Sequence, residues 1–559
     1  MRYARLWTVN PGTSSNTLTV RRKKMEVNNN QMPQYNNQMP QYNNIQGNPM
    51  PQGVPVMQGV PVRPAATITT VRVGNSENFK KYSLLALIFG IVYSFCLYHN
   101  HASITHPIFM VAALVILKLM RAKEGLSLIA DCNGKKGLGI FYVVSLVLLS
   151  IHRCLTTSWA LEFLERTAIV LLFMSFIVYL YVDTTGFDIG AWFAGIFVTL
   201  IKPLEHIARP VRDHRAYKKA IGKEGSADKN KMIVAIIIGI GVALALLVVI
   251  LPLLASADAV FENLLSNIKL DIDDNVVYAI KMVLTAIVFF WAAYTIITSL
   301  AAKELKVKAM GEGTTDPVIA ITFTSIIGAV YILFCAIQFI YLFSGNVALP
   351  KNYTYAEYAH EGFYQLLAVC ILNVIMVSVC QAFFKESKVL KALLTVIAVC
   401  TYIMIASSAM RMILYVGAYH LTFLRLFVLW FLAVLCFWLA FLIASLYIKR
   451  FPVFRACMVA ITIAFIAFTY SNPDYRIAEY DLVAAGDDID EYKSVKDYIT
   501  NNLSYDAVPA IAGNEELVDA YERAHSDRHY MDEDKYTGFR KFNVSYYIAH
   551  QTLKFYKAG

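Results

Sequence analysis

The sequence has few charged residues for its length. Asp, Glu, Lys and Arg make up 16% of the 559 residues, whereas about 25% is usual for a soluble domain. Apolar residues make up 57% and gather in long segments. Helices buried in a large soluble protein mostly carry an apolar stripe on one side, but these segments are apolar all round. The composition therefore excludes an array of soluble domains and indicates an integral membrane protein.

Motifs that carry known chemistry are also missing. The nine cysteines form no CxxC pair, and seven of them lie inside apolar segments, where a free cysteine behaves as a small hydrophobe. The sequence has no Walker P-loop, GxSxG, HExxH or dinucleotide fingerprint in a credible strand–helix context, and it has no nucleic-acid-binding fold. We expect no metal, no cofactor and no nucleic-acid partner, assign no catalytic residue, and favour a protein that is not an enzyme.

Twelve apolar segments lie between Tyr82 and Tyr470. A helix needs about 20 residues to span a hydrocarbon core, and several of the segments reach that length. We therefore expect an all-α fold, a polytopic transmembrane bundle. The segments are 82–98, 104–120, 138–151, 167–183, 187–201, 233–255, 277–300, 318–343, 363–382, 389–409, 422–447 and 453–470.

Basic residues predict how the chain threads the bilayer, because lysine and arginine concentrate in cytoplasmic loops. Residues 202–231 contain nine basic and four acidic side chains, and 121–136 are also basic. If both connections are cytoplasmic, one of the three segments between them does not cross. We expect this to be 187–201, which is short and begins beside Asp188, as an interfacial or half-inserted helix. About eleven spans result; a twelfth would reverse the side of the C-terminus.

We expect the protein to lie in the plasma membrane. This topology places its N-terminus in the cytoplasm and its C-terminal domain on the extracytoplasmic side. Five regions are predicted. They are a disordered Asn/Gln/Pro/Met-rich arm (1–78), N-terminal transmembrane helices (79–201), a basic cytoplasmic connection (202–231), a transmembrane core (232–471) and a soluble helical C-terminal domain (472–559). Arg21–Lys24 directly precede Met25, as an in-frame ribosome-binding site would encode, so we expect translation to start at Met25; Met1 is the alternative.

Ionisable residues within a membrane bundle are candidates for function. Glu357 and Glu361 lie one helical turn apart, and Arg411 and Arg425 bracket a short outer connection. Their pairing would form a polar pocket that faces outward, together with Tyr355 and Tyr415. The alternative interpretation is an interfacial girdle of tyrosine and arginine with interhelical hydrogen bonds from Gln338 and Asn373.

The basic connection offers a second candidate site. Its cationic side chains would contact anionic lipid headgroups. Equally, they could act only as a topology signal. The residues are Arg209, Arg212, Arg215, Lys218 and Lys219.

Several blocks, taken together and in order, resemble a family of bacterial membrane proteins, domain of unknown function 4173, with 4153 as a relative. The resemblance runs from about residue 230 to the C-terminus. The blocks are Leu253–Asp258 with Val260-Phe261, Gln338–Phe343, Thr354–Ala359 with Gly362-Phe363, Ser408–Met412 with Leu414-Tyr415, Asn472–Asp474, Leu503-Ser504 with Asp506–Pro509, and Arg540–Asn543. The family carries basic residues where this chain has His360-Glu361. The resemblance implies a fold and no activity.

Three functions stay open. The first is a non-enzymatic envelope, signalling or scaffold component that acts through its C-terminal domain. The second is a transporter or permease for a small polar or anionic solute, which needs a polar cavity reaching the membrane midplane. The third is a membrane-embedded transferase that uses Glu357 or Glu361 as a general base. Apart from the lipid bilayer, the sequence identifies no partner.

Overall fold

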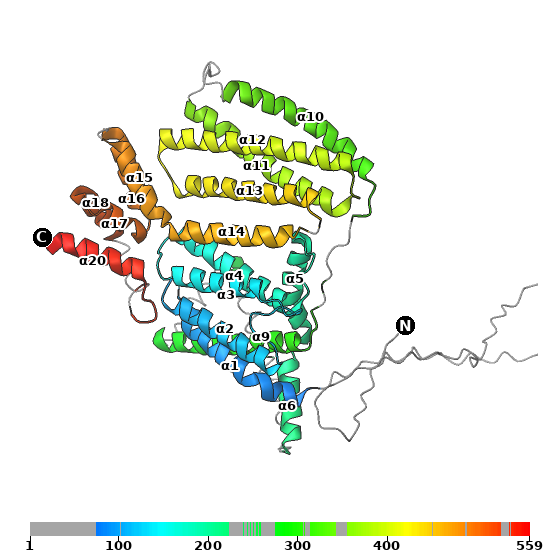
Figure 1. The fold of residues 1–559 in the computed structure, drawn as a ribbon. Coiled ribbons are helices and arrows are strands. Elements are labelled where there is room, and N and C mark those ends of the chain that lie inside the picture. The colour runs from blue at the N-terminus through cyan, green and yellow to red at the C-terminus, as the bar shows by residue number, and fades with distance from the viewer. Residues whose placement is uncertain are drawn as a thin grey trace, which may run out of the picture. The chain divides into compact units, whose positions relative to one another are not determined.

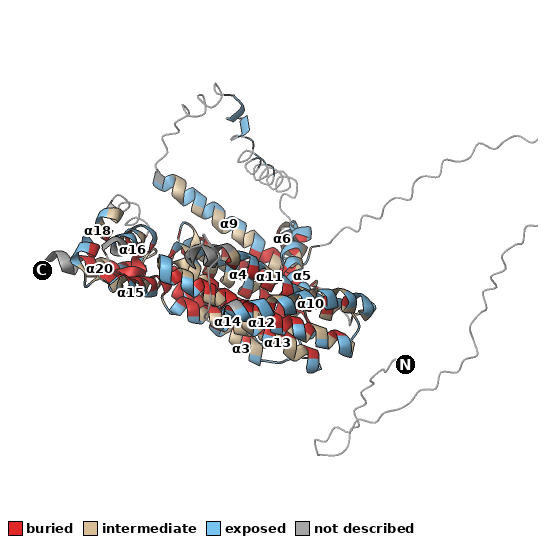
Figure 2. Cartoon of the chain, turned by 90° about the horizontal axis from the view of Figure 1, so that it is seen from above, coloured by how far each residue is buried: buried red, intermediate tan, exposed pale blue. Residues whose placement is uncertain are grey.

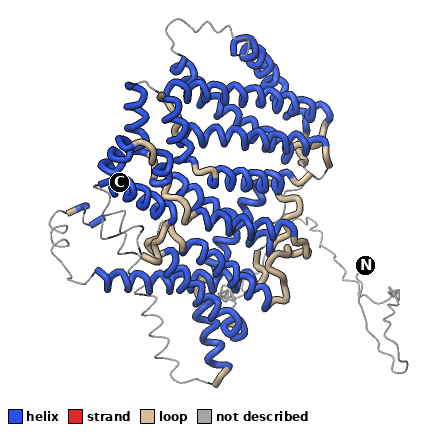
Figure 3. Tube along the Cα trace, turned by 60° about the vertical axis from the view of Figure 1, so that its left-hand side comes forward, coloured by secondary structure: helices blue, strands red, loops and turns tan. Residues whose placement is uncertain are grey.

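The computed structural model describes residues 74–100, 102–222, 274–305, 313–342, 355–449, 451–486, 489–526 and 538–558, with scattered positions at 239–258, 307 and 536. The described chain is helical or loop, apart from an isolated bridge between Thr315 and Phe384 (Figure 3). The prediction of an all-α transmembrane fold is confirmed. Nine of the described helices are long and apolar enough to cross a bilayer.

The nine long apolar helices and the shorter helix α3 fall into two groups by their cores. The first group contains α1 (Ser76–Leu97), α2 (Thr105–Lys123), α3 (Gly137–His152), α4 (Trp159–Tyr181) and α9 (Asp274–Ala301). The second group contains α10 (Pro317–Leu342), α11 (Tyr355–Phe383), α12 (Lys388–Tyr419) and α13 (Phe423–Tyr447). Helix α14 (Val453–Tyr470) packs against both α3 and α13 and so joins the two groups (Figure 1).

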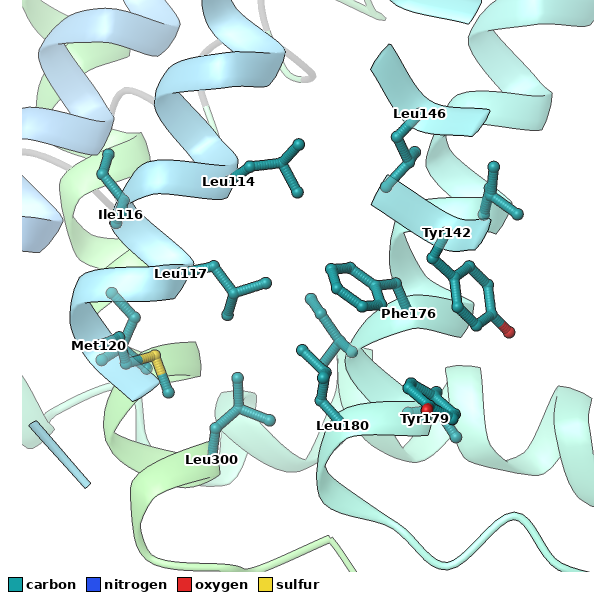
Figure 4. Close-up of a cluster of buried hydrophobic side chains, with 14 of the residues drawn as sticks. Leu114, Ile116, Leu117, Met120, Tyr142, Leu146, Phe176, Tyr179, Leu180 and Leu300 are labelled. Carbon is teal, nitrogen blue, oxygen red and sulfur yellow. The ribbon is translucent and has the colours of Figure 1, made fainter. Parts of the chain in front are cut away.

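Large apolar side chains fill the core of the first group. Leu117 and Met120 of α2 face Phe176 and Leu180 of α4 (Figure 4). Helix α1 lies close to α9, because Gly90 brings its backbone against the Ala286 carbonyl. This close contact leaves no room for a side chain at position 90, which explains the glycine there.

Apolar side chains also cover the outside of the bundle. Only 6% of the most apolar part of α9 is buried, and exposed positions run along this helix in Figure 2. Such a surface would be unfavourable in water, whereas hydrocarbon accepts it. Helix α3 is apolar but only 16 residues long. The predicted span 233–255 lies outside the described residues, apart from scattered positions.

The two ends of the bundle differ. At one end, which we call the docking end, the chain continues into α15 (Pro473–Ala485), α16 (Ile489–Asn502), α17 (Val508–Ile511), α18 (Glu515–Ser526) and α20 (Val544–Ala558) (Figures 1 and 2). At the other end, the α6 end, lie α5 (Ile189–Ile201), the short helix η1 (Lys202–His206) and α6 (Arg209–Ala220).

Helix α5 runs across the direction of the spans in Figure 1. Asp188 caps its first turn by accepting a hydrogen bond from the Ala191 N–H. Its C-terminal end leads into η1, which packs against the end of α9. Both ends of α5 lie at the α6 end in Figure 1. The segment Ile189–His206 and helix α6, which meet at an angle of 50°, are together also long and apolar enough to form one bent span. That 187–201 does not cross, and that the chain has eleven spans, therefore stay predictions.

The start of α1 and the presence of α15 differ from what the sequence indicated. Helix α1 begins at Ser76, inside the predicted arm 1–78, because the Asn75 side chain accepts hydrogen bonds from the Glu77 and Asn78 N–H groups and caps the helix. Helix α15 was not predicted. It starts at Pro473, which suits a first helical turn, after Asn472 in the left-handed backbone region with φ 52°.

Candidate functional site

Two residues of the predicted pocket, Tyr415 and Arg425, lie together at a small cavity. The Arg425 guanidinium lies over the Tyr415 ring, 4.3 Å from its centre. Both residues line a cavity of about 150 Å³ together with Phe363, Tyr364, Met412, Thr422 and Leu424. Pockets for small-molecule ligands usually measure about 300–1,000 Å³, so this cavity holds only a few waters.

Arg411 does not line that cavity. It is buried, with 5% of its surface exposed, and its guanidinium lies against Gly362 and within 3.4 Å of the Gln338 side-chain oxygen. The two side chains of α12 therefore point in different directions, Arg411 into the bundle and Tyr415 toward the cavity. Glu357, Glu361 and Tyr355 lie in the first turns of α11, but their side chains are outside the described part of the structure. The predicted pairing of acids with arginines stays a prediction.

Polar residues deeper in the second group bond to one another. The Tyr331 hydroxyl donates to the Asn373 side-chain oxygen at 2.7 Å, and the Asn373 amide donates to the Thr401 hydroxyl at 2.9 Å. Ser407 donates to Gln338 at 2.8 Å. These bonds join α10, α11 and α12. They agree with the interpretation of Gln338 and Asn373 as interhelical hydrogen-bonding residues.

The predicted lipid-contact residues occupy two different environments. Arg209 forms an ion pair with Glu304 at 2.7 Å, and His206 lies 3.3 Å from the same carboxylate. Arg215, Lys218 and Lys219 are exposed on α6, and Arg212 is half-buried. Arg212, Arg215 and Lys219 follow at intervals of three and four residues and so share one helical face.

The opposite face of α6 holds the helix in place. The buried Asp213 carboxylate accepts hydrogen bonds from the Tyr294 hydroxyl at 2.9 Å and from the Asn75 N–H at 2.8 Å. The basic face is therefore held outward at the α6 end by contacts to α1 and α9. Contact of this face with lipid headgroups stays a prediction.

The most extensive polar cluster lies at the docking end, and the sequence did not reveal it. The Asp506 carboxylate accepts hydrogen bonds from the Thr156 hydroxyl at 2.6 Å and from the Thr157 N–H and hydroxyl, each at 2.8 Å. The Ser545 hydroxyl also donates to it. One buried carboxylate thus joins the α3–α4 loop to two segments of the C-terminal helices.

A second part of this cluster is built around Asn543. Its side-chain amide donates to the carbonyls of Ala102 and Thr156, at 3.0 and 2.9 Å. Backbone bonds run beside it, from Val544 N–H to the Cys154 carbonyl at 2.8 Å and from Ile104 N–H to the Phe542 carbonyl at 2.9 Å. The segment before α20 is therefore fastened to the α1–α2 and α3–α4 loops. We call the contacts of Asp506 and Asn543 the docking cluster.

The C-terminal helices also contact the second group. The Leu421 N–H donates to the Asp481 carboxylate at 2.7 Å, and the Phe423 N–H donates to the Tyr498 hydroxyl at 3.2 Å. Val416 and Leu421 belong to the same apolar core as Ile477 of α15. The C-terminal helices thus hold both groups at one end.

Two acidic groups lie close together in this region. Burial raises the pKa of Asp474 to about 6, and the nearby Asp506 carboxylate adds to the increase. Hydrogen bonds from the Ser504 N–H and hydroxyl, at 3.2 and 2.7 Å, oppose this effect only partly. Asp474, Ser504, Asp506 and Asn543 all belong to the blocks that carried the family resemblance, which was the only sequence signal for this cluster.

These features define a polytopic α-helical membrane protein with a small helical region fixed to one end. The chain matches the family model described as Domain of unknown function (DUF4153) over residues 143–514, well over half of its length, and it belongs to that family. No curated protein and no solved structure matches the chain.

The family match refines the resemblance in the sequence. The matching family is 4153, which was expected as a relative, and the match does not show a relationship to 4173. It begins in α3 at residue 143, earlier than the expected residue 230, and ends at residue 514, before Arg540–Asn543. It therefore includes the α3–α4 loop, so two of the three residues that bond to Asp506, Thr156 and Thr157, lie within the family region, whereas Ser545 lies beyond it.

Proposed function

We propose that this protein is a non-enzymatic envelope scaffold, which holds its C-terminal helices in a fixed position at the outer face of the plasma membrane. The observation that carries the proposal is the docking cluster. A buried carboxylate with four donors and a buried amide with two acceptors join segments far apart in the chain. A flexibly tethered domain would need none of these bonds.

The polar groups inside the second helix group favour this function over a carrier. A carrier needs a polar site near the midplane, whereas the mid-depth groups Asn373, Gln338 and Thr401 bond to one another. The cavity beside Arg425 is small. The side chains of Glu357 and Glu361, on which a transferase would depend, lie outside the described residues. Transport and transfer remain the alternatives that the experiments below separate from the scaffold.

The proposed orientation places α6 and the N-terminus in the cytoplasm. The exposed basic face of α6 would then meet the anionic inner leaflet, with the acidic C-terminal region outside. A phosphatase reporter fused after Gly559 should be active only when it is exported. Activity of a cytosol-specific reporter at the same position would contradict this orientation.

The scaffold function predicts which variants lose activity in the cell. Asp506→Ala combined with Asn543→Ala should undock the C-terminal helices without blocking membrane insertion. In the native host, this variant should reproduce the envelope defect of a gene deletion, measured as sensitivity to osmotic shock and detergent. Arg425→Ala tests the small cavity, and Asp519→Ala, at an exposed position of α18, is the matched control.

Two outcomes would contradict the scaffold. The first is a docking variant that inserts normally and behaves as wild type in a host where the gene deletion has a clear defect. The second is a full defect from Arg425→Ala alone with the docking cluster intact, which would favour a transport or transfer pocket.

A further inference from the structure

A large groove separates the two helix groups, and the proposed function does not use it. Its volume is about 1250 Å³, which exceeds the usual range of about 300–1,000 Å³ for small-molecule pockets. Side chains of α4, α5, α11, α13 and α14 line it. Most of them are apolar, such as Leu171, Trp192, Val379, Trp430 and Ile461.

The groove is open to its surroundings along apolar side chains. Phe163 on α4 is 68% exposed, Phe193 on α5 is 56% exposed and Phe383 on α11 is 48% exposed, and all three line it. Water in such a groove would find few hydrogen-bonding partners. Because most of the lining belongs to spanning helices, acyl chains are the material beside it that matches its chemistry.

One end of the groove is polar and carries a cation. Arg455, near the start of α14, donates a hydrogen bond to the Thr184 hydroxyl at 2.9 Å. Thr185 and Gln381 line the same groove. Within the described part of the chain, Arg455 has no carboxylate at ion-pair distance. Asp183 is near enough to feel its charge without forming an ion pair, and Asp188 is occupied with capping α5.

The Arg455 guanidinium lies at the end of the spans, the level at which lipid headgroups lie in a bilayer. Arg455 is in the first turn of α14, at the α6 end of the spans, and it is half-buried. Arginines near helix ends extend toward the membrane interface, and a guanidinium binds phosphate through paired, charge-assisted hydrogen bonds. A long apolar groove that ends at an arginine is thus complementary to an amphiphile with an anionic head.

We propose that the groove binds a glycerophospholipid with an anionic headgroup, its acyl chains between α4 and α14 and its phosphate at Arg455. The bound lipid fills the space between the two helix groups on the membrane side, while the C-terminal helices hold the groups at the docking end. The proposal does not depend on the scaffold function.

Tryptophan fluorescence offers a direct test. Trp192, Trp430 and Trp438 line the groove, and the chain has six tryptophans. Replacing Trp7, Trp159 and Trp291 by Phe leaves only the groove tryptophans as reporters. This protein is placed in phosphatidylcholine nanodiscs that contain increasing fractions of phosphatidylglycerol brominated on its acyl chains, which quenches nearby indoles. Brominated phosphatidylcholine in place of the brominated phosphatidylglycerol measures nonspecific quenching.

We expect brominated phosphatidylglycerol to quench at a lower mole fraction than brominated phosphatidylcholine. Arg455→Gln should raise the phosphatidylglycerol fraction needed for half-maximal quenching by about tenfold, as for the loss of one charge-assisted contact to phosphate. Lys385→Gln is the matched control. It removes one positive charge from an exposed position at the same end of the bundle without touching the groove, and it should leave quenching unchanged.

Two results would overturn the proposal. Equal quenching by the two lipids would show that the groove holds bulk lipid without selecting a headgroup. Selectivity that survives Arg455→Gln would place the anionic contact elsewhere. Native mass spectrometry of the unmodified chain, released from equimolar phosphatidylglycerol and phosphatidylcholine, provides a second test that needs no variant. It should retain phosphatidylglycerol, and retention of both lipids equally would also contradict the proposal.

Discussion

Replacing Asp506 by alanine should loosen the C-terminal helices from the membrane helices. In the wild type, the Asp506 carboxylate accepts hydrogen bonds from Thr156, Thr157 and Ser545 and is only 3% exposed. The substitution leaves four donors without their acceptor, the buried Thr156 hydroxyl and three half-buried groups of Thr157 and Ser545. One hydrogen bond to a charged group contributes about 1.5–3 kcal/mol, so we expect the loss of all four to cost about 3–5 kcal/mol, since half-buried donors regain water in part.

Hydrogen exchange can measure this loss residue by residue. The Val544 and Ile104 amides donate across the docked surfaces, to the Cys154 and Phe542 carbonyls, so they exchange only when the surfaces separate. A loss of about 3–5 kcal/mol corresponds to roughly 100- to 4,000-fold faster exchange, at about 1.4 kcal/mol for each factor of ten. Amides in the middle of α12 serve as an internal reference and should keep their rates.

The control for this experiment is Asp519→Ala, which removes an exposed carboxylate from α18 and should change neither amide by more than a few-fold. Unchanged exchange at Val544 and Ile104 in a correctly inserted Asp506→Ala protein would refute the reasoning. The contacts would then contribute too little free energy to hold the helices.

Three further predictions follow from individual contacts. The pKa of Asp474, about 6 in the folded protein against an ordinary 3.8, means that the folded state favours the protonated acid. The contribution of Asp474 to the stability of the docked region should be greatest below about pH 4 and fall by up to about 3 kcal/mol as the pH rises through 6, and Asp474→Asn should remove this part of the pH dependence, as followed by limited proteolysis of the two proteins side by side. Gly90→Ala should destabilise the first helix group by about 1–3 kcal/mol in thermal unfolding, because the added Cβ would lie 2.4 Å from a carbonyl of α9, whereas Gly328→Ala meets nothing within 4 Å and should be neutral. Glu304→Gln should weaken the contact to Arg209 by about 1–2 kcal/mol and increase protease cleavage within α6; unchanged cleavage would contradict this.

The sequence predicted the membrane helices well because their cause is local. A helix that crosses hydrocarbon must be long and apolar whatever surrounds it, so the segment 422–447 alone predicts α13 (Phe423–Tyr447). The charge of the loops likewise predicts that 187–201 does not cross, and the helix found there, α5, differs from the spans in running across their direction in Figure 1. These inferences needed no knowledge of which helix packs on which.

The candidate site was harder to predict because it depends on packing. Arg411 and Arg425 flank one short connection, so the sequence placed them in one pocket. In the structure, Arg411 points into the bundle toward Gln338, whereas Arg425 stacks on Tyr415 at a small cavity. Which face of α12 turns inward is decided by α10 and α11, and the residues on either side of Arg411 do not reveal it.

The docking cluster could not be predicted from the sequence for a related reason. Asp506 is one of seventeen acidic residues between 472 and 559, and nothing local distinguishes it. Its partners Thr156 and Thr157 lie about 350 positions earlier. Only the family resemblance, which included Asp474, Ser504, Asp506 and Asn543, marked these residues, and it did so without a physical reason. The structure supplies that reason, since they join the C-terminal helices to the membrane helices or to one another.

The most direct test of the docked arrangement is a distance measured in a bilayer. Spin labels would be attached at positions 159 and 519, both exposed, one on α4 and one on α18, with the exposed Cys132 replaced by serine. Pulsed electron–electron double resonance in nanodiscs should give a single narrow distribution of distances between the two labels. The distribution should broaden in Asp506→Ala. A broad distribution in the wild type would show a freely tethered C-terminal region and contradict the central claim.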